Sequence, residues 1–212
     1  MKAPDALRFL VTAGPTREFF DPIRYISNRS SGKMGYALAE AARAVSPHVV
    51  LVSGPTALVP PKGVEFVSVT TALEMADAVL TRYEQCDVVI MTAAVCDFRP
   101  EKTSPLKIKK DKFDGTTKFE PTVDILEELG KRKQGQLLIG FAAETDDVER
   151  NARVKLERKR LDLIVANDVS AFEADSNAVT LIGRTGTPDR LPRMSKREVA
   201  GAIIQRILKH VA

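Results

Sequence analysis

The stretch Gly14-Pro-Thr-Arg-Glu18, which continues to Arg24-Tyr-Ile-Ser-Asn-Arg-Ser-Ser-Gly-Lys-Met-Gly35, decides the fold predicted for this chain. An apolar run, Leu7 to Ala13, precedes it and a helical pattern, Tyr36 to Ala44, follows it. The stretch is therefore predicted to be a long polar loop between a strand and a helix. Unpaired N–H groups and the helix dipole favour negative charge at a helix N-terminus. Ser30-Ser31-Gly32-Lys33 lies at that position and predicts a phosphate site.

An ordinary N-cap serine followed by a solvated lysine is the alternative to a phosphate site. The loop also holds Arg17, Arg24, Asn28 and Arg29, which are more polar donors than capping needs. We therefore expect phosphate or substrate binding by the glycines, hydroxyls, amide and guanidinium of this loop, namely Gly14, Arg24, Asn28, Ser30, Ser31 and Gly32.

Outside this loop, short apolar runs alternate with helical patterns. Strands are expected over 7–13, 49–52, 64–69, 88–92, 137–142, 163–166 and 178–182, and helices over 33–44, 72–84, 124–131, 148–160 and 195–211. This alternation predicts an α/β fold, a Rossmann-like, mostly parallel sheet with helices on both faces. Ligands of such sheets lie beyond the carboxyl ends of the strands. No G-x-G-x-x-G follows the first strand, which disfavours an NAD-type enzyme.

The length of 212 residues fits one α/β domain, or one domain with a small appendage, and we expect a single nucleotide-binding domain over residues 1–212. No apolar run approaches the roughly 18–20 residues of a membrane span, and the start of the chain lacks a signal-peptide pattern. Cys86 and Cys96 have neither metal nor disulfide spacing, so we expect buried thiols and a cytoplasmic location. With only His48 and His210, a histidine-based triad or zinc site is disfavoured.

The net charge of +4 and the pI near 9.1 are compatible with nucleic acid or with a small polyanionic substrate. Aromatic content is 6% and there is no Trp, so no stacking motif interleaves with the basic residues. Three classes of protein stay open on composition alone: an enzyme, a non-catalytic nucleotide-binding module and a nucleic-acid-binding domain.

Residues 100–121 interrupt the alternation and are rich in lysine. Leu106 and Ile108 alternate with lysines, and Asp114-Gly115 is a hairpin turn signal. We predict a β-hairpin flap that projects from the domain and could pair with a second subunit. The alternative for most of these lysines is a solvated surface arm.

Two further segments follow strands and have residues suited to a nucleotide. Thr92 to Phe98 combines small residues with Asp97, which could accept hydrogen bonds from sugar hydroxyls, bind a metal or form a turn. In Gly140 to Thr145, Phe141 could stack on a base or belong to the core, and Glu144 could bind Mg²⁺ or cap a helix.

Lys155 and Lys159 are four residues apart on a predicted helix, which places both ammonium groups on one face. Like charges at this spacing repel, and a phosphate partner would reverse the sign of the interaction. The alternative is a solvated face balanced by Glu157 and Asp162. The Asn167-Asp168 tip of the next strand could complete a pocket or turn the chain.

Several of these motifs together resemble those of phosphopantothenoylcysteine synthetase, and more narrowly the synthetase half of the bacterial bifunctional coenzyme A biosynthesis protein. They are residues 21–35, Ala93-Ala-Val-Cys-Asp-Phe98, Lys107-Ile-Lys-Lys110, Gly140-Phe-Ala-Ala-Glu-Thr145, Lys155 with Lys159, and Leu161 to Asp168. The resemblance runs from Phe9 to the helix after Met194. The flavin-dependent decarboxylase half that usually precedes the synthetase is missing, so we expect a free-standing synthetase or an excised domain.

The resemblance implies a phosphopantothenate–cysteine ligase. The family activates the carboxylate of 4′-phosphopantothenate with CTP, as an acyl-cytidylate, and releases pyrophosphate. Cysteine then displaces CMP to give 4′-phosphopantothenoylcysteine. Mg²⁺ or Mn²⁺ accompanies the triphosphate, and the enzyme is a homodimer joined partly by an extended strap. A separate flavin-dependent decarboxylase is a candidate partner, and neither nucleic acid nor a membrane is expected.

Residue roles follow from the same resemblance. Asn28 matches the asparagine that handles the acyl-cytidylate, and its amide is expected to hydrogen-bond the acyl carbonyl. Lys107 matches the essential lysine, a mobile cation beside the α-phosphate that also binds nucleotide. Arg24 is expected near substrate or the dimer partner, and the metal ligands stay unknown. Further nucleotide-binding positions are Met91, Thr92, Ala93, Asp97, Phe141, Lys155 and Lys159. Cys96 departs from the Ala or Ser common in the family, and Phe19-Phe20 from smaller aliphatics.

Overall fold

The computed structural model describes residues 2–112, 115–144, 147–168 and 176–211. The helices are α1 (Lys33–Arg43), α2 (Ala72–Leu80), α3 (Ile125–Arg132), α4 (Val148–Arg158) and α5 (Lys196–Val211). The strands are β1 (Phe9–Ala13), β2 (Arg17–Phe19), β3 (Tyr25–Ser27), β4 (Val49–Ser53), β5 (Glu65–Ser68), β6 (Val88–Met91), β7 (Phe98–Pro100), β8 (Phe119–Pro121), β9 (Leu137–Glu144), β10 (Leu163–Asp168), β11 (Ser176–Gly183) and β12 (Asp189–Ser195).

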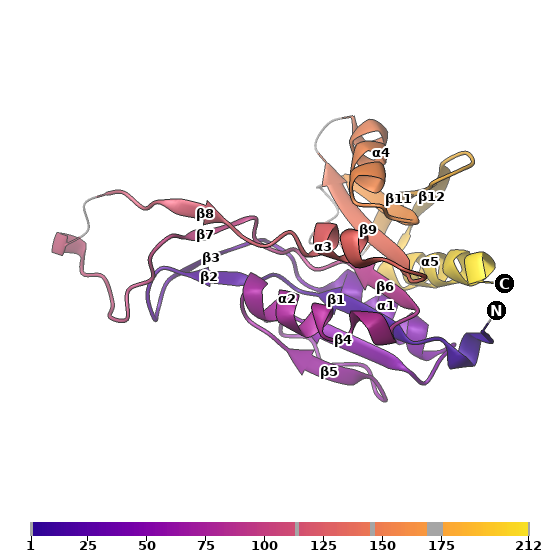
Figure 1. Cartoon of the computed structure of the whole chain (residues 1–212), viewed down its shortest axis with the longest axis horizontal. Coiled ribbons are helices and arrows are strands. Elements are labelled where there is room, and N and C mark those ends of the chain that lie inside the picture. Colours follow the sequence, from indigo (N-terminus) through magenta and orange to yellow (C-terminus); the bar gives the residue numbers. More distant parts are fainter. Residues whose placement is uncertain (1, 113–114, 145–146, 169–175, 212) are drawn as a thin grey trace.

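An eight-stranded sheet forms the body of the molecule, in the order β12-β11-β10-β9-β6-β1-β4-β5 (Figure 1). Pairing is parallel from β10 to β5 and antiparallel where β11 and β12 extend the sheet. The predicted mostly parallel sheet is therefore confirmed. The chain leaves β1 toward β4 on one side and returns through β6 on the other, so the strand order reverses beside β1. Ligands of open α/β sheets bind at such a point.

Two cores lie on opposite faces of the sheet because successive side chains of a strand alternate between the faces. Phe9 and Val11 of β1 pack in the core that includes α1 and α5, whereas Leu10 packs in the core that includes α2, α3 and α4. Burial on both faces explains why the strands were recognisable as continuous apolar runs. Helices thus cover both faces, as predicted.

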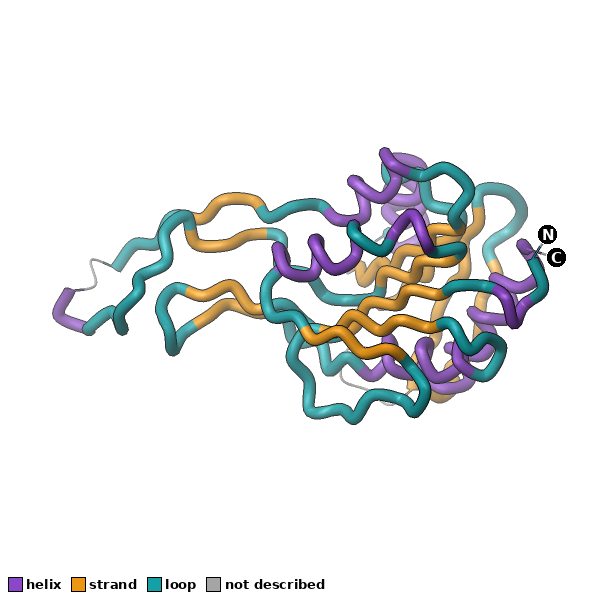
Figure 2. Tube along the Cα trace, turned by 60° about the horizontal axis from the view of Figure 1, so that its bottom comes forward, coloured by secondary structure: helices purple, strands orange, loops and turns teal. Residues whose placement is uncertain are grey.

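Two antiparallel hairpins form an arm that projects from the carboxyl edge of the sheet (Figures 1 and 2). β2 pairs with β3, and β7 pairs with β8 only at the base of the predicted flap. Leu106 and Ile108 lie outside any strand, and Asp114 lies outside the described residues. The expected strand pairing is absent at Ile108 because its N–H donates to Asp21 Oδ2 (3.1 Å) and its carbonyl accepts from Arg24 (2.7 Å).

The two hairpins of the arm are connected by hydrogen bonds and by one aromatic contact. The ring of Phe20 meets that of Phe119 edge to face at 6.0 Å, and the Ser104 N–H donates to the Phe20 carbonyl (2.9 Å). The large apolar side chains of the arm remain exposed, among them Ile23 and Leu106. The arm therefore lacks a core of its own. Within the described part of the chain, no helix combines the length and apolarity needed to cross a membrane.

Candidate active site

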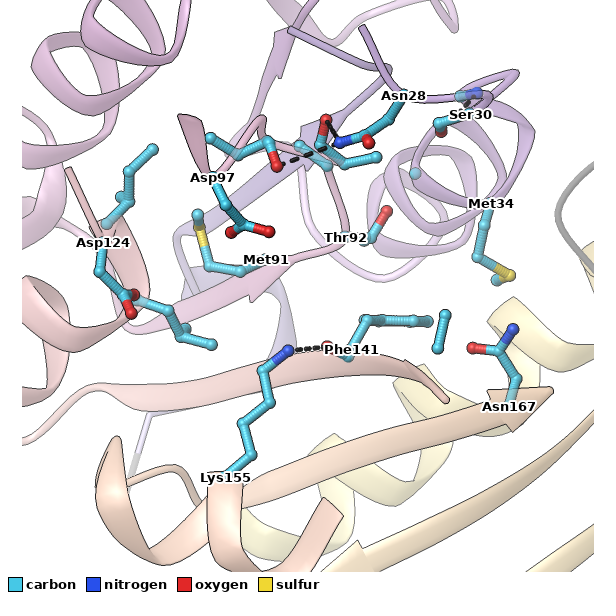
Figure 3. A pocket seen from close by; sticks show the side chains of 18 of the residues that line it. Asn28, Ser30, Met34, Met91, Thr92, Asp97, Asp124, Phe141, Lys155 and Asn167 are labelled. Atoms are coloured by element: carbon cyan, nitrogen blue, oxygen red, sulfur yellow. Dashed lines mark hydrogen bonds between the residues drawn. The ribbon is translucent and has the colours of Figure 1, made fainter. Parts of the chain in front are cut away.

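A cavity of about 670 Å³ opens at the carboxyl edge of the sheet, beside the point where the strand order reverses (Figure 3). It is lined by Asn28, residues 30–35, residues 91–95, Asp97, Phe98, residues 121–126, Phe141, Ala143, Lys155, Lys159, Asn167, Asn177 and Lys196. The structure thus brings together most of the residues that the sequence singled out. Gly14, Arg24 and Lys107 are the predicted site residues that do not line this cavity.

Two threonines of the β1 region fix the loop after β6. Thr12 is fully buried, and its Oγ1 accepts hydrogen bonds from the N–H groups of Thr92 and Ala93, both at 3.1 Å. Thr16 Oγ1 accepts from the Cys96 N–H at 2.9 Å. These hydroxyls supply the partners that the backbone lacks once β6 ends. Sequence reasoning missed both residues, although a hydroxyl inside the apolar run 7–13 was a usable signal.

Asn28 is anchored to the same loop through its amide nitrogen. Nδ2 donates to the carbonyl oxygens of Ala94 (3.0 Å) and Val95 (3.1 Å). Carbonyls only accept hydrogen bonds, so the pairing fixes which end of the amide faces them. Oδ1 is left as the free polar atom of this exposed side chain. The sequence hypothesis had used the amide N–H for the acyl carbonyl, but both N–H groups are engaged in this structure.

The expected phosphate loop leads directly into α1 and reaches the cavity. Gly32 precedes the helix with φ of +77°, a left-handed conformation that suits glycine. Ser31 Oγ is buried and has no hydrogen-bond partner among the described residues. Ser30 Oγ accepts from the Gly32 N–H at 3.3 Å. Gly14 instead lies beneath the loop with φ of +71°, where an added Cβ would stand 2.8 Å from the Gly54 carbonyl oxygen.

The opposite end of the cavity carries paired charges. Lys159 is 8% exposed, and its Nζ lies 2.5 Å from Asp124 Oδ2. Asp124 also caps α3, because Oδ1 accepts from the Glu127 N–H at 3.0 Å. Partial burial acts to raise the pKa of Asp124, but the Lys159 ammonium and the Glu127 amide outweigh it and the pKa is lowered. Lys155 Nζ donates to the Phe141 carbonyl at 2.8 Å.

Asp124 was not identified from the sequence as a site residue. The available signal was an acidic residue at the start of a predicted helix, which is also what simple capping produces. Only the fold shows that the buried ammonium of Lys159 meets it.

Lys107 and Arg24 lie on the arm. Arg24 pairs with Asp21 (2.6 Å between Nη2 and Oδ2), and its guanidinium holds the pKa of that buried carboxyl well below its usual range. The same guanidinium donates to the Ile108 carbonyl. We call this group of Asp21, Arg24 and Ile108 the arm clamp. Lys107 is exposed next to the clamp, so within a single chain it is separate from the cavity.

Metal ligands are sparse in the part of the chain that the structure describes. No group of three or more His, Cys, Asp or Glu side chains gathers there, and Asp97 and Asp124 are the carboxylates that line the cavity. The side chains of Glu144 and Asp168 lie outside the described residues. Cys86 and Cys96 are free and buried, and burial raises the pKa of each thiol, to about 11 for Cys86.

These features define a Rossmann-like α/β domain whose cavity, lined by lysines and a helix N-terminus, lies beyond the strand ends. The chain belongs to the family described as the DNA/pantothenate metabolism flavoprotein C-terminal domain, whose model matches residues 5–211.

Individual relatives agree with this assignment. The chain is 52% identical over 203 residues to the coenzyme A biosynthesis bifunctional protein CoaBC of Bacillus subtilis (strain 168), covering 93% of this chain and 50% of that protein. It therefore spans about half the length of this curated relative. A crystal structure of the C-terminal domain of a CoaBC protein superposes with a TM-score of 0.86 at 46% identity, covering 100% of this chain and 98% of that one.

A more distant structure shares the fold. It is a Cab2 mutant, H337A, in complex with phosphopantothenate-cysteine, with a TM-score of 0.78 at 17% identity, covering 98% of this chain and 88% of that one.

Proposed function

We propose that this chain is a CTP-dependent phosphopantothenate–cysteine ligase of coenzyme A biosynthesis, formed as one domain over residues 1–212 and working in the cytoplasm. The observation that carries the proposal is the convergence of Asn28, Asp97, Phe141, Lys155 and Lys159 on one cavity, in a chain 52% identical to a CoaBC protein. In the first step a carboxylate oxygen of 4′-phosphopantothenate attacks the α-phosphorus of CTP and pyrophosphate leaves. In the second step the cysteine amine attacks the acyl carbon, the bond to CMP breaks and the amine loses a proton.

We expect the nucleotide to lie along the cavity, with its parts contacting different lining residues. Asp97 lies between the two ends and suits ribose hydroxyls, and the Phe141 and Lys155 pair lies opposite it across the cavity (Figure 3). Met91, Thr92 and Ala93 line one wall of the cavity, and Thr12 fixes the backbone there because its hydroxyl accepts from the N–H groups of Thr92 and Ala93. The Asp124–Lys159 pair, already compensated, suits a polar neutral base better than a phosphate.

Mg²⁺ or Mn²⁺ is expected to enter with the triphosphate. Magnesium is commonly held by one or two carboxylates together with substrate phosphates. Of the two carboxylates in the described lining, Asp124 is paired with Lys159, so Asp97 is the better candidate for a metal ligand. When bound, the ion would neutralise charge on the phosphates.

The orientation of Asn28 supports a role for this residue in the second step. Since its Nδ2 hydrogens bind the Ala94 and Val95 carbonyls, Oδ1 is available to accept a hydrogen bond. An attacking amine carries the N–H groups that such an acceptor can orient. We therefore assign Asn28 to positioning the cysteine amine rather than to donating to the acyl carbonyl.

Lys107 is assigned to the first step through a homodimer. Its position beside the arm clamp separates it from the cavity of its own chain. The exposed apolar side chains of the arm, with Leu106 next to Lys107, suit burial against a second copy. Such pairing would also bring Arg24 toward the partner.

Pyrophosphate release tests the proposed function directly. With phosphopantothenate, cysteine and Mg²⁺, we expect release with CTP and little with ATP. Release that requires phosphopantothenate but stops after about one turnover without cysteine would demonstrate the acyl-nucleotide step. Absence of release with both nucleotides from folded protein would overturn the proposal and leave a non-catalytic binding module.

A further inference from the structure

Thr16 is the neighbour of Asn28 at the base of the first hairpin of the arm. β2 pairs with β3 in a register that sets Arg17 opposite Ser27, so Thr16 and Asn28 are the next residues on the two sides. Ser27 Oγ donates to the Thr16 carbonyl at 2.7 Å and closes this end of the hairpin. Thr16 is fully buried, whereas Asn28 is exposed and lines the cavity. The base of the hairpin thus joins a residue of the interior to a residue of the site.

The direction of the Asn28 amide depends on two carbonyl groups, those of Ala94 and Val95 (Figure 3). The first of them, the Ala94 carbonyl, also accepts from the backbone N–H of Thr16 at 3.2 Å. A carbonyl oxygen has two lone pairs and can accept both hydrogen bonds at once. The backbone of Thr16 therefore fixes the first carbonyl that Asn28 binds.

The hydroxyl of Thr16 acts on the second carbonyl through a single peptide unit. The Val95 carbonyl and the Cys96 N–H belong to the same trans peptide, which is planar and directs the two groups to opposite sides. Thr16 Oγ1 accepts from this N–H at 2.9 Å, and the carbonyl accepts from Asn28 Nδ2 at 3.1 Å. The hydroxyl therefore fixes the plane in which the carbonyl meets the amide. A hydrogen bond at the N–H also polarises the carbonyl and makes it a better acceptor.

The side chain of Thr16 is suited to holding a peptide in place. Branching at Cβ restricts the χ1 angle of threonine, so the direction of its hydroxyl is nearly fixed. Thr16 and Cys96 are both buried, so water cannot readily replace either partner of their hydrogen bond. The hydroxyl of Thr12, by contrast, accepts from peptides whose carbonyls do not bind Asn28. The two threonines thus have different effects on the site.

We propose that Thr16 is a positioning residue for the second step of the reaction, because it holds both carbonyls that orient the amide of Asn28. The part played in the reaction rests on the proposed function, whereas the orientation of Asn28 by Thr16 does not. With both N–H groups of Nδ2 engaged, Oδ1 remains available to accept from the cysteine amine. Without the Thr16 hydroxyl the peptide could rotate and the amide could turn over. It would then present N–H groups to an amine that has N–H groups of its own.

Thr16→Val tests this role in the whole chain, because valine keeps the shape of threonine and lacks the hydroxyl. We expect conversion of the acyl-nucleotide by cysteine to slow by about 10- to 100-fold, the loss typical of a misplaced group at a reacting centre. Pyrophosphate release in a single turnover without cysteine reports the first step and should change by less than about twofold, which also shows that the variant is folded. Thr16→Ser keeps the hydroxyl, and should convert the intermediate within about threefold of the wild-type rate.

Two further comparisons separate positioning from a loss of stability. Ser46 is also buried, and its hydroxyl accepts from the His48 N–H at 3.1 Å, but it lies outside the cavity lining. Ser46→Ala should lower the Tm without changing the ratio of the two step rates. In an Asn28→Ala background, Thr16→Val should slow conversion no further, because the group that it positions is gone. Losses that multiply in the double variant would overturn the proposal.

The side-chain amide of Asn28 gives a readout that needs no substrate. Its two hydrogens, assigned in NMR spectra by their absence in Asn28→Ala, should exchange with solvent about tenfold faster in Thr16→Val than in the wild type. Unchanged exchange would overturn the proposal. Faster exchange with normal conversion would overturn the role in the second step while the ligase stood. A wild-type protein without turnover, whose Asn28 amide still depends on Thr16, would contradict the ligase and support the orientation.

Discussion

The body and the arm of this molecule are stabilised by different interactions. In the body, both faces of the sheet are covered, and each fully buried aliphatic side chain contributes about 1.5–3 kcal/mol. In the arm, short hairpins expose Ile23, Leu106 and Phe119 and depend on the arm clamp for their shape. The cavity thus belongs to the rigid part, whereas Lys107 belongs to a part that lacks a core. This difference predicts that ligand binding and chemistry can be separated by substitution.

Lys107→Gln is expected to have the largest effect. If the arm supplies its charge only during the first step, acyl-nucleotide formation should fall by about 10²- to 10³-fold while CTP affinity changes little. Rapid-quench measurement of pyrophosphate in a single turnover would give the rate. Lys102→Gln, an exposed lysine of the same arm, is the control. An affinity that falls as far as the rate would mean that Lys107 already contacts bound nucleotide.

Asn28→Asp should have a comparable effect on the second step alone. A carboxylate has no N–H to donate, so it would repel the Ala94 and Val95 carbonyls instead of binding them. We expect turnover to fall by about 10²-fold, with the acyl-nucleotide accumulating on the enzyme. Chromatography of quenched reactions would detect the intermediate. Normal turnover by this variant would remove Asn28 from the mechanism.

Asp124→Asn tests the body through the free energy of unfolding rather than through a reaction rate. The variant keeps an N-cap acceptor but leaves the buried Lys159 ammonium without its partner. We expect the free energy of unfolding to fall by about 2 kcal/mol and the Tm by about 4–8 °C. Glu127→Gln, which breaks an exposed pair with Lys131 on the same helix, should cost less than about 0.5 kcal/mol.

The pH dependence of that stability difference has a definite sign. The pKa of Asp124 is lower in the folded state, so its contribution is present above the unfolded pKa of about 3.9 and is lost as pH falls through the folded value. The free energies of unfolding of wild type and Asp124→Asn, measured with denaturant, should therefore begin to converge below about pH 4 and meet only below the folded pKa of Asp124. A difference that stays constant down to pH 2 would contradict the ion pair.

Leu106→Ser should have the smallest effect, confined to association. Leu106 is 75% exposed, so its loss should leave the Tm unchanged. If the arm pairs with a second copy, the dimer Kd measured by sedimentation should rise by about tenfold. Val59→Ser, an exposed apolar residue of the body, should leave the Kd unchanged. A monomer at every concentration in the wild type would exclude the dimer outright.

The same contrast explains how much could be predicted from the sequence. The main strands of the body were predictable because burial on both faces leaves apolar runs. β12 was missed because it is an edge strand whose residues, such as Arg190 and Arg193, are mostly exposed. β2 and β3 are three residues each, too short to leave a periodic signal.

Within the site, residue types were predictable and orientations were not. Asn28 was identified, but its direction depends on two carbonyls more than sixty positions away in the chain. Lys196 was not expected in the cavity lining, because a lysine at a predicted helix start carries no signal until the fold brings it there.

The arm clamp lies close in the chain to both Lys107 and Asn28, the residues assigned to the first and second steps of the reaction. Arg24 leads through β3 directly into Asn28, while Ile108 is the neighbour of Lys107. The residue assigned to activation and the residue assigned to coupling are therefore both connected through the chain to the arm clamp. If the arm shifts on contact with a second copy of the chain, Lys107 and Asn28 would move together. Activation and coupling would then depend on the same movement.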